Sequence, residues 1–426
     1  MFDFQITMKP RLPDDILHLL CEELVDQRDF GTLFNCCCVS KSLAVPALAG
    51  LYRGQDLSLI KARDSDLNAS LAEQELIVQR WSIQWRSIIL SALDKTLLPY
   101  CQYLRVLDLG DLEMLFEEVR FQPGGSIFSY FFSGHLARFN IPIATGTLTK
   151  TRSGKPRPPR LNFSAIFEAI GDEIIPKAPN LQRIDGPRGC IDLKTNQVAL
   201  AGIVSWLLSC HNLHTLTLHN FTSGAVLATP VLLSDKIRLE ELEIDNYPES
   251  DQDTFHRALL NQTSLQRLLL DGEEVQTFDS LAVFVHSIEQ LKQLRSLKLV
   301  WVSNKFNDQH INTIAEQLTN LEHLYIGGLG LRDVSLESMA NLKNLQSVSF
   351  SGLTNFTMDG FLELIGRLGP GNKGLVLTVD NANPDDGLSE EEQTFVRNAL
   401  VEAVDGRFEY IFLRDPNMSE FEGESD

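Results

Sequence analysis

The chain has 426 residues, 43% of them hydrophobic, so it is long enough to bury a large core and is not a disordered chain. Its 57 acidic residues outnumber 37 basic ones and give a net charge of −20, which disfavours nucleic acid and acidic membranes as partners. No apolar run reaches about 18 residues, Met1 to Pro10 lack a secretory pattern, and the seven cysteines show no disulfide framework. We therefore expect an intracellular protein, cytoplasmic, nuclear or both, with free thiols.

Residues 1–53 are predicted to be a small helical module that is too short to have a stable core of its own. A proline and apolar residues at helical spacing predict the first helix, at Pro13, Ile16, Leu17, Leu20 and Leu24. The apolar residues of the second and third helices are Leu33, Phe34 and Cys37, and then Leu43, Ala44 and Leu48. Ser40 is expected to cap the third helix.

This module resembles the F-box family. The resemblance is carried by Leu12-Pro13, Ile16-Leu17, Leu20, Asp29-Phe30, Leu33 and Val39-Ser40-Lys41. It implies a substrate-receptor subunit of an SCF-type cullin–RING ubiquitin ligase, whose F-box binds a Skp-family adaptor and, through it, a cullin–RING core. The residues that the resemblance places against the adaptor are Leu12, Pro13, Ile16, Leu17, Leu20, Leu33 and Val39. The alternative is that these residues form the hydrophobic seam of a three-helix cap over the repeats that follow.

Residues 54–180 are predicted to be irregular, with a disordered loop near 121–160. This loop contains a basic segment, whose cations are Lys150, Arg152, Lys155, Arg157 and Arg160. Prolines and a glycine between these cations favour a solvated insertion. The alternative is a localisation signal or a docking site for an acidic partner.

The pattern L-x-x-L-x-L occurs six times in succession. The copies begin at Leu213, Leu239, Leu265, Leu294, Leu321 and Leu345. Their start-to-start distances of 26, 26, 29, 27 and 24 residues fall within the roughly 20 to 29 typical of leucine-rich repeats. Weaker copies begin at Leu104 and Leu181. At the position where such repeats often carry Asn or Cys, the six copies instead have Phe221, Tyr247, Glu273, Val302, Leu329 and Leu353, so we expect their hydrogen-bonded ladder to be absent or differently built.

Within each copy the spacing of the apolar residues changes. The first residues alternate between apolar and polar, which is typical of a strand, and later ones are three or four residues apart, as in a helix, for example Ile311, Ile314 and Leu318. One such unit cannot bury its own apolar face, so neighbouring units must stack. We therefore predict an α/β leucine-rich-repeat solenoid over 54–413, regular over 181–379, with a parallel sheet on its concave face and helices on its convex face.

The stack needs a cap at its end. Ser389 and Glu392 form a capping box that predicts a helix through Val396 and Leu400, followed by a strand-like stretch from Phe408. We expect this C-terminal cap to cover 389–413 and to be followed by a disordered acidic tail, 414–426.

No part of the sequence predicts catalysis. Cys36, Cys37 and Cys38 point about 100° apart on a helix and cannot together bind zinc. A set of Cys190, Cys210, His211 and His214 lacks the spacing of a zinc finger. The sequence has no phosphate-binding loop, no dinucleotide fingerprint and no nucleophile elbow. We therefore expect a non-catalytic protein with no cofactor, whose partners supply any ligase chemistry.

The residues between the strand leucines are predicted to line the concave face, because side chains alternate along a strand. The candidate client-binding residues are Glu241, Glu243, Asp245, Arg267, Asp271, Lys298, Trp301, His323 and Tyr325. Their acidic and aromatic character predicts a client protein with a basic segment and an apolar residue. The alternatives are ordinary solvated strand residues and, for the whole chain, a repeat scaffold with no role in degradation.

Overall fold

The computed structural model describes most of the chain. The residues that it describes are 12–27, 29–53, 70–143, 161–185, 197–218, 224–245, 252–272, 281–300, 302–303, 305–327, 330–352, 354–382 and 387–412. The chain divides into two compact units, Met1–Gly189 with Ser205–Asn212, and Cys190–Val204 with Leu213–Asp426. Within the described ranges, none of the helices combines the length and apolar character that crossing a bilayer requires.

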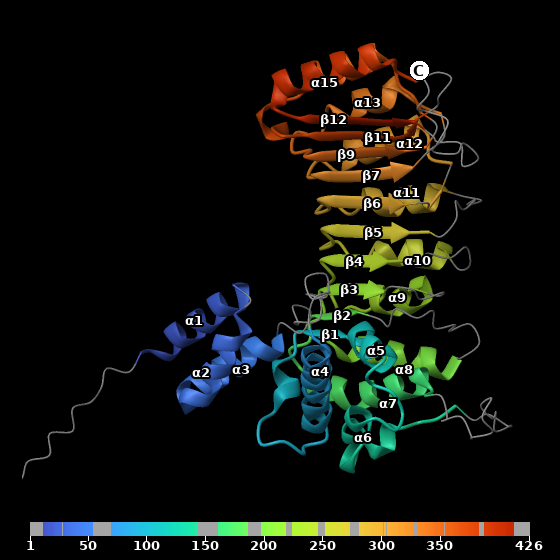
Figure 1. Ribbon diagram of the computed structural model, residues 1–426. Coiled ribbons are helices and arrows are strands. Elements are labelled where there is room, and N and C mark those ends of the chain that lie inside the picture. The colour runs from blue at the N-terminus through green and yellow to red at the C-terminus, as the bar shows by residue number, and fades with distance from the viewer. Residues whose placement is uncertain are drawn as a thin grey trace, which may run out of the picture. The chain divides into compact units, whose positions relative to one another are not determined.

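The first unit begins with a three-helix module. Its helices are α1 (Asp14–Asp26), α2 (Phe30–Val39) and α3 (Lys41–Arg53) (Figure 1). The predicted cap is present: the Ser40 hydroxyl accepts a hydrogen bond from the Leu43 N–H at 3.2 Å, and Asp29 likewise caps α2 through the Thr32 N–H at 3.0 Å. α1 begins directly after Pro13, one residue later than predicted. The core of the module consists of Cys21, Val25, Leu33 and Ala47.

The remainder of the first unit is mainly helical. Its elements include α4 (Leu71–Ala92), η3 (Tyr100–Tyr103), β1 (Val106–Asp108), α5 (Leu109–Glu117), α6 (Ser126–Phe131), η4 (Gly134–Phe139), α7 (Phe163–Ile174), η5 (Ile175–Lys177) and β2 (Arg183–Asp185). The strands β1 and β2 belong to the two weak copies of the leucine pattern. They pair in parallel, with Val106 opposite Arg183.

The predicted disordered loop near 121–160 is wrong over 121–143, which fold into α6 and η4. Phenylalanines hold this segment together: the ring of Phe116 lies 5.5 Å from that of Phe121 and 5.7 Å from that of Phe131. Phe121 and Phe131 are buried. Burial of several aromatic rings offsets the conformational entropy that ordering the segment costs. Residues 144–160, with the basic segment, lie outside the described residues.

A buried carboxylate joins α4 to α5. The indole N–H groups of Trp81 and Trp85 both donate to one oxygen of Asp111, at 2.8 Å each. The Asp111 N–H in turn donates to the side chain of Asp108, which caps α5. A buried charge is tolerated only with such partners, so this arrangement fixes the two helices against each other.

Within the described residues, ten parallel strands form one sheet in the order β1-β2-β3-β4-β5-β6-β7-β9-β11-β12. The strands of the second unit are β3 (Thr215–Leu218), β4 (Glu241–Ile244), β5 (Arg267–Asp271), β6 (Ser296–Val300), β7 (His323–Gly327), β9 (Ser347–Ser351), β11 (Val376–Ala382) and β12 (Arg407–Phe412). Figure 1 shows these strands stacked in chain order. The predicted α/β class with a parallel sheet is confirmed.

Helices alternate with these strands. They are α8 (Gln197–Ser209), α9 (Gly224–Leu232), α10 (Gln252–Leu259), α11 (Leu281–Glu289), α12 (Asp308–Gln317), α13 (Asp333–Met339), α14 (Met358–Gly366) and α15 (Glu390–Val404). Short elements complete the second unit: β8 (Leu331–Arg332) pairs with β10 (Thr354–Asn355), and η6 spans Pro370–Asn372. α15 starts at the predicted capping box of Ser389 and Glu392, and β12 follows it. The acidic tail lies outside the described residues.

The leucine pattern produces an in-register column of buried side chains. Equivalent positions of the six copies pair directly across the strands, and these are Leu216, Leu242, Leu268, Leu297, Leu324 and Val348. Each is at most 2% exposed. Every copy therefore buries its apolar residues against its neighbours, and each such side chain stabilises the fold by roughly 1.5–3 kcal/mol.

A polar ladder runs along the turns that precede the strands. The side chain just before the first leucine of a copy donates to a backbone carbonyl of the preceding copy: Ser264 to Leu239 at 2.8 Å, and Asn320 to Lys292 at 2.9 Å. Asn212 does the same to Pro179, at 2.8 Å. This ladder satisfies carbonyls that would otherwise be left without partners. We expected the ladder after the strands to be absent or differently built, and these hydrogen bonds come from residues before the strands.

Candidate protein-binding surfaces

The three-helix module carries several exposed apolar side chains. We define the module surface as Leu12, Ile16, Leu19, Leu20, Phe34 and Val39. Their exposed fractions run from 38% for Ile16 to 73% for Val39. Ile16, Leu19 and Leu20 are three and four residues apart, so they share one face of α1. Single exposed leucines are ordinary, but a group at helical spacing in so small a module makes this surface a candidate for protein binding.

Two of the seven predicted adaptor-facing residues are buried within the module. Leu17 and Leu33 are 5% and 0% exposed and lie inside the module, so the prediction that they face a partner is wrong. The reason is that three short helices need a core, and Leu17, Cys21 and Val25 form the inner face of α1 at four-residue spacing. The other five predicted residues are exposed, and they are Leu12, Pro13, Ile16, Leu20 and Val39.

The prediction missed Leu19 and Phe34 as surface residues, with exposed fractions of 59% and 62%. Nothing in the apolar pattern distinguishes them from core residues. Their exposure follows from which face of each helix the neighbouring helices cover, and a sequence of apolar residues on a short helix does not specify that.

Three of the four cysteines of the module, Cys21, Cys36 and Cys37, belong to its core or pack against it, and Cys38 is exposed. Cys21 lies in the core, with Cys36 and Cys37 packed against it. Burial, with smaller contributions from the neighbouring thiols, raises the pKa of Cys37 to about 11. Burial also raises the pKa of Cys21. Because the thiolate is the reactive form, these residues are poor nucleophiles at neutral pH and behave as small apolar core residues.

The second unit presents an open sheet face. Along β4, β5, β6 and β7 buried residues alternate with partly or fully exposed ones, so one side of the sheet packs inward and the other is accessible. The strand register places Glu243, Leu269, Lys298, Tyr325 and Ser349 in one row across this face. The predicted grid of side chains is therefore present along these strands. Thr217, which lies between two leucines of β3, and Ser351 at the end of β9 are buried instead.

The predicted acidic patch is partly neutralised within the chain. Arg267 of β5 forms an ion pair with Glu241 of β4, the residue opposite it in the register. Asp271 follows at the end of β5, where burial, and next the charge of Asp245, raise the pKa of its carboxyl. Burial and the charge of Asp245 disfavour the ionised form of Asp271. A positive charge placed beside this carboxyl would favour ionisation. Acidity on this face is thus concentrated at the ends of β4 and β5.

The remaining predicted client-binding residues are distributed along β6 and β7. Lys298 of β6 is exposed, and His323 and Tyr325 are half-buried on the neighbouring strand β7. Trp301 lies outside the described residues. The face therefore changes from acidic at β4 and β5 to aromatic and basic at β6 and β7. It offers hydrogen-bonding and apolar groups together.

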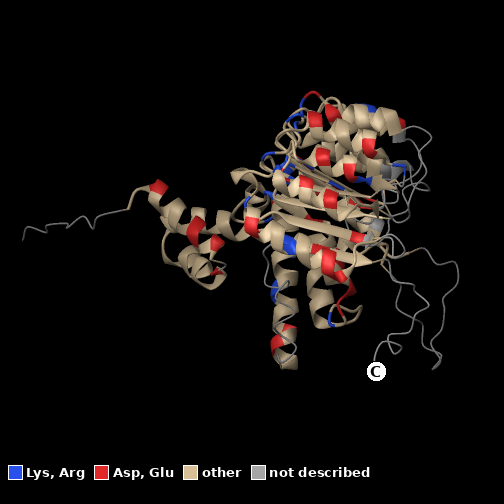
Figure 2. Cartoon of the chain, turned by 90° about the horizontal axis from the view of Figure 1, so that it is seen from above, with Lys and Arg blue, Asp and Glu red and all other residues tan. Residues whose placement is uncertain are grey.

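Charge elsewhere on the chain is dispersed. Figure 2 shows acidic residues on many helices and strands. Among the described residues, no group of three or more histidines, cysteines or carboxylates is arranged to hold a metal ion. Of the four residues Cys190, Cys210, His211 and His214 considered above, Cys190 lies outside the described residues. A comparison of the chain with known protein families finds no family that matches.

Proposed function

We propose that this protein is the substrate-receptor subunit of an SCF-type ubiquitin ligase, with an F-box module that binds a Skp-family adaptor and a leucine-rich-repeat solenoid that binds the protein to be ubiquitinated. The observation that carries the proposal is the module surface. Four of its residues, Leu12, Ile16, Leu20 and Val39, belong to the pattern that resembles the F-box family, and they are exposed although other residues of the module pack together in its interior.

Adaptor binding would cover this surface. Removing a large apolar side chain from water stabilises a complex by roughly 1.5–3 kcal/mol before the costs of association. Six such residues offer enough apolar area for a stable interface. A partner that is itself apolar and helical fits a stripe of residues three and four apart on α1.

The open sheet face is the proposed site for the client. Successive strands present one row of side chains each, so a client that crosses the strands meets acidic groups at β4 and β5 and then Lys298 and Tyr325. A basic segment followed by an apolar residue is complementary to that order. The module surface and this face belong to different units of the chain, so the two partners would not compete for the same residues.

Adaptor binding is tested by co-expression and affinity purification of the full chain with a Skp-family adaptor. Leu20→Asp should abolish co-purification, because a carboxylate would be buried in an apolar interface. Leu76→Asp is the matched control, since Leu76 of α4 has a similar exposed fraction, 44% against 48% for Leu20. The proposal predicts that adaptor is retained by the Leu76 variant. If the intact chain retains no adaptor, the ligase function is rejected and a non-degradative repeat scaffold is the better conclusion.

Client recognition is tested separately with a fluorescent nona-arginine peptide as a probe of the acidic face. Combined reversal of Glu241, Glu243 and Asp245 to Lys should weaken binding, and added salt should weaken binding to the unaltered chain. A triple reversal at the exposed helix residues Glu337, Glu363 and Glu402 matches the change in net charge. Equal losses in both triple variants would show that net charge alone attracts the probe and would remove the acidic face from the proposal.

A further inference from the structure

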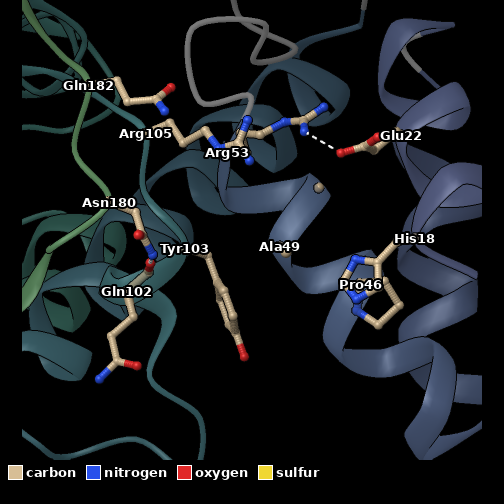
Figure 3. Close-up of a pocket in the computed structure, with 11 residues that line it drawn as sticks. His18, Glu22, Pro46, Ala49, Arg53, Gln102, Tyr103, Arg105, Asn180 and Gln182 are labelled. Atoms are coloured by element: carbon tan, nitrogen blue, oxygen red, sulfur yellow. Dashed lines mark hydrogen bonds and ion pairs between the residues drawn. The ribbon is translucent and has the colours of Figure 1, made fainter. Parts of the chain in front are cut away.

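The first unit contains a cavity of about 270 Å³ (Figure 3). One wall is formed by α1 and α3, through His18, Glu22, Ala49 and Arg53. The opposite wall is formed by the segments that lead into β1 and β2, and Figure 3 shows the Tyr103 ring on that side. The cavity takes no part in the module surface or in the open sheet face.

Both walls are held in place by interactions within the chain. The Arg105 carbonyl accepts hydrogen bonds from the N–H groups of Gln182 and Arg183, at 2.8 and 3.0 Å, which fixes Arg105 beside Gln182. Across the cavity, Arg53 forms an ion pair with Glu22 at 2.9 Å and so joins α3 to α1 (Figure 3). The backbone at Arg105 and the side chains of Arg53 and Glu22 are therefore held in place, which lowers the entropy cost of binding a ligand.

The charge of the lining is positive although the chain as a whole is acidic. The lining includes the guanidinium groups of Arg53 and Arg105 and one carboxylate, that of Glu22. The Glu22 carboxylate is already paired with Arg53. Within the described residues, the Arg105 side chain has no ion pair. The guanidinium fork matches the geometry of phosphate oxygens, and the neighbouring amide of Gln182 and hydroxyl of Tyr103 suit hydroxyl groups.

We propose that this cavity binds a small phosphorylated molecule, of the size of a sugar phosphate or smaller, with its phosphate on Arg105. The volume sets the upper limit, because pockets for larger ligands commonly enclose about 300–1,000 Å³. The net charge of −20 means that the chain as a whole repels phosphate, so binding at this cavity depends on its local cations. The inference does not depend on the proposed function, because it invokes neither adaptor nor client.

Isothermal titration calorimetry of the full chain with pyrophosphate and with glucose 6-phosphate, at constant ionic strength, tests the proposal. Both should bind saturably, and glucose should not. Arg105→Gln should weaken binding at least about tenfold, the effect of losing one charge-assisted contact. Arg80→Gln removes an exposed guanidinium of α4 and should leave the affinity unchanged.

A second variant tests the location without altering charge. Ala49→Leu places a larger side chain in the cavity and should also weaken binding, with an unchanged circular dichroism spectrum as evidence that it folds. Absence of binding by the intact chain would overturn the proposal. Equal binding by the Arg105 and Arg80 variants would overturn it as well, because the phosphate would then lie elsewhere.

Discussion

The three-helix module and the sheet of the second unit both use regularly spaced leucines, but they leave different surfaces uncovered. In the sheet, the leucines of each copy pack against the next copy, and the accessible face carries polar and charged side chains such as Glu243 and Lys298. In the module, α1 buries Leu17 and leaves Ile16 and Leu20 exposed. Stacking thus gives the leucines of the sheet apolar neighbours from the same chain, whereas the module leaves apolar side chains exposed, and these are the side chains that the proposed adaptor would cover.

The largest expected effect is on the inner side of the sheet. Leu297→Asp places a carboxylate in the buried column and should lower the free energy of unfolding by more than about 4 kcal/mol. The adjacent Lys298→Asp, on the open face, should change it by less than about 0.5 kcal/mol. Urea unfolding followed by circular dichroism measures both. Similar midpoints for the two variants would contradict the division of the strand into inner and open sides.

A core residue of the module should behave in the same way. Leu33→Ala leaves a cavity among the three helices and should cost roughly 2–5 kcal/mol, whereas Phe34→Ala removes an exposed ring and should cost little. Thermal unfolding of the two variants provides the comparison. A large loss of stability for Phe34→Ala would mean that this ring is packed within the chain and is not part of the module surface.

The stability of the chain should depend on pH through His256 of α10. Burial lowers the pKa of His256 to about 4 from an ordinary value of 6.5, and its ring lies 4.4 Å from that of Phe284. The unfolded chain therefore binds this proton at higher pH than the folded chain. Stability that is present above pH 6.5 should be lost as the pH falls towards 4, by about 3 kcal/mol in total.

His256→Phe isolates that contribution, because the phenylalanine ring replaces the imidazole without a titrating group. Urea unfolding at several pH values should show a smaller decrease for this variant than for the unaltered chain. Parallel pH profiles would show that His256 does not titrate differently in the folded and unfolded states.

The smallest expected effect on stability is at the module surface itself. Leu20→Asp should leave the melting temperature nearly unchanged, because Leu20 is 48% exposed and has little contact area to lose. Differential scanning calorimetry measures this. A stable variant that no longer binds the adaptor would separate folding from binding, whereas a strongly destabilised one would assign Leu20 to the core.

Periodicity predicted the parts of the fold in which local spacing determines burial. Each of the six copies, from Leu213 to Leu345, leads into a strand, and the capping box at Ser389 opens α15. The F-box and leucine-rich-repeat assignments remain proposals based on residue patterns. The pattern also predicted which strand residues lie on the open face. Side chains alternate along a strand, so Glu243 and Tyr325, which lie between buried residues, must point to the other side.

Non-periodic contacts could not be predicted in this way. Phe121 and Phe131 pack around Phe116 at irregular sequence spacing, so the segment resembled a loop. The ion pair of Arg267 with Glu241 depends on which rotamers meet across two strands. Leu17 and Leu20 have the same apolar character, and only the packing of α2 and α3 decides which of them is buried.

Hydrogen–deuterium exchange of the full chain, with and without a Skp-family adaptor, tests the central claim most directly. Protection should increase in peptides that cover α1 and α2 and should not change in β4 to β7. That result would place the partner on the module surface and leave the open sheet face available to a client. Protection confined to β4 to β7, or no protection anywhere at saturating adaptor, would contradict the account.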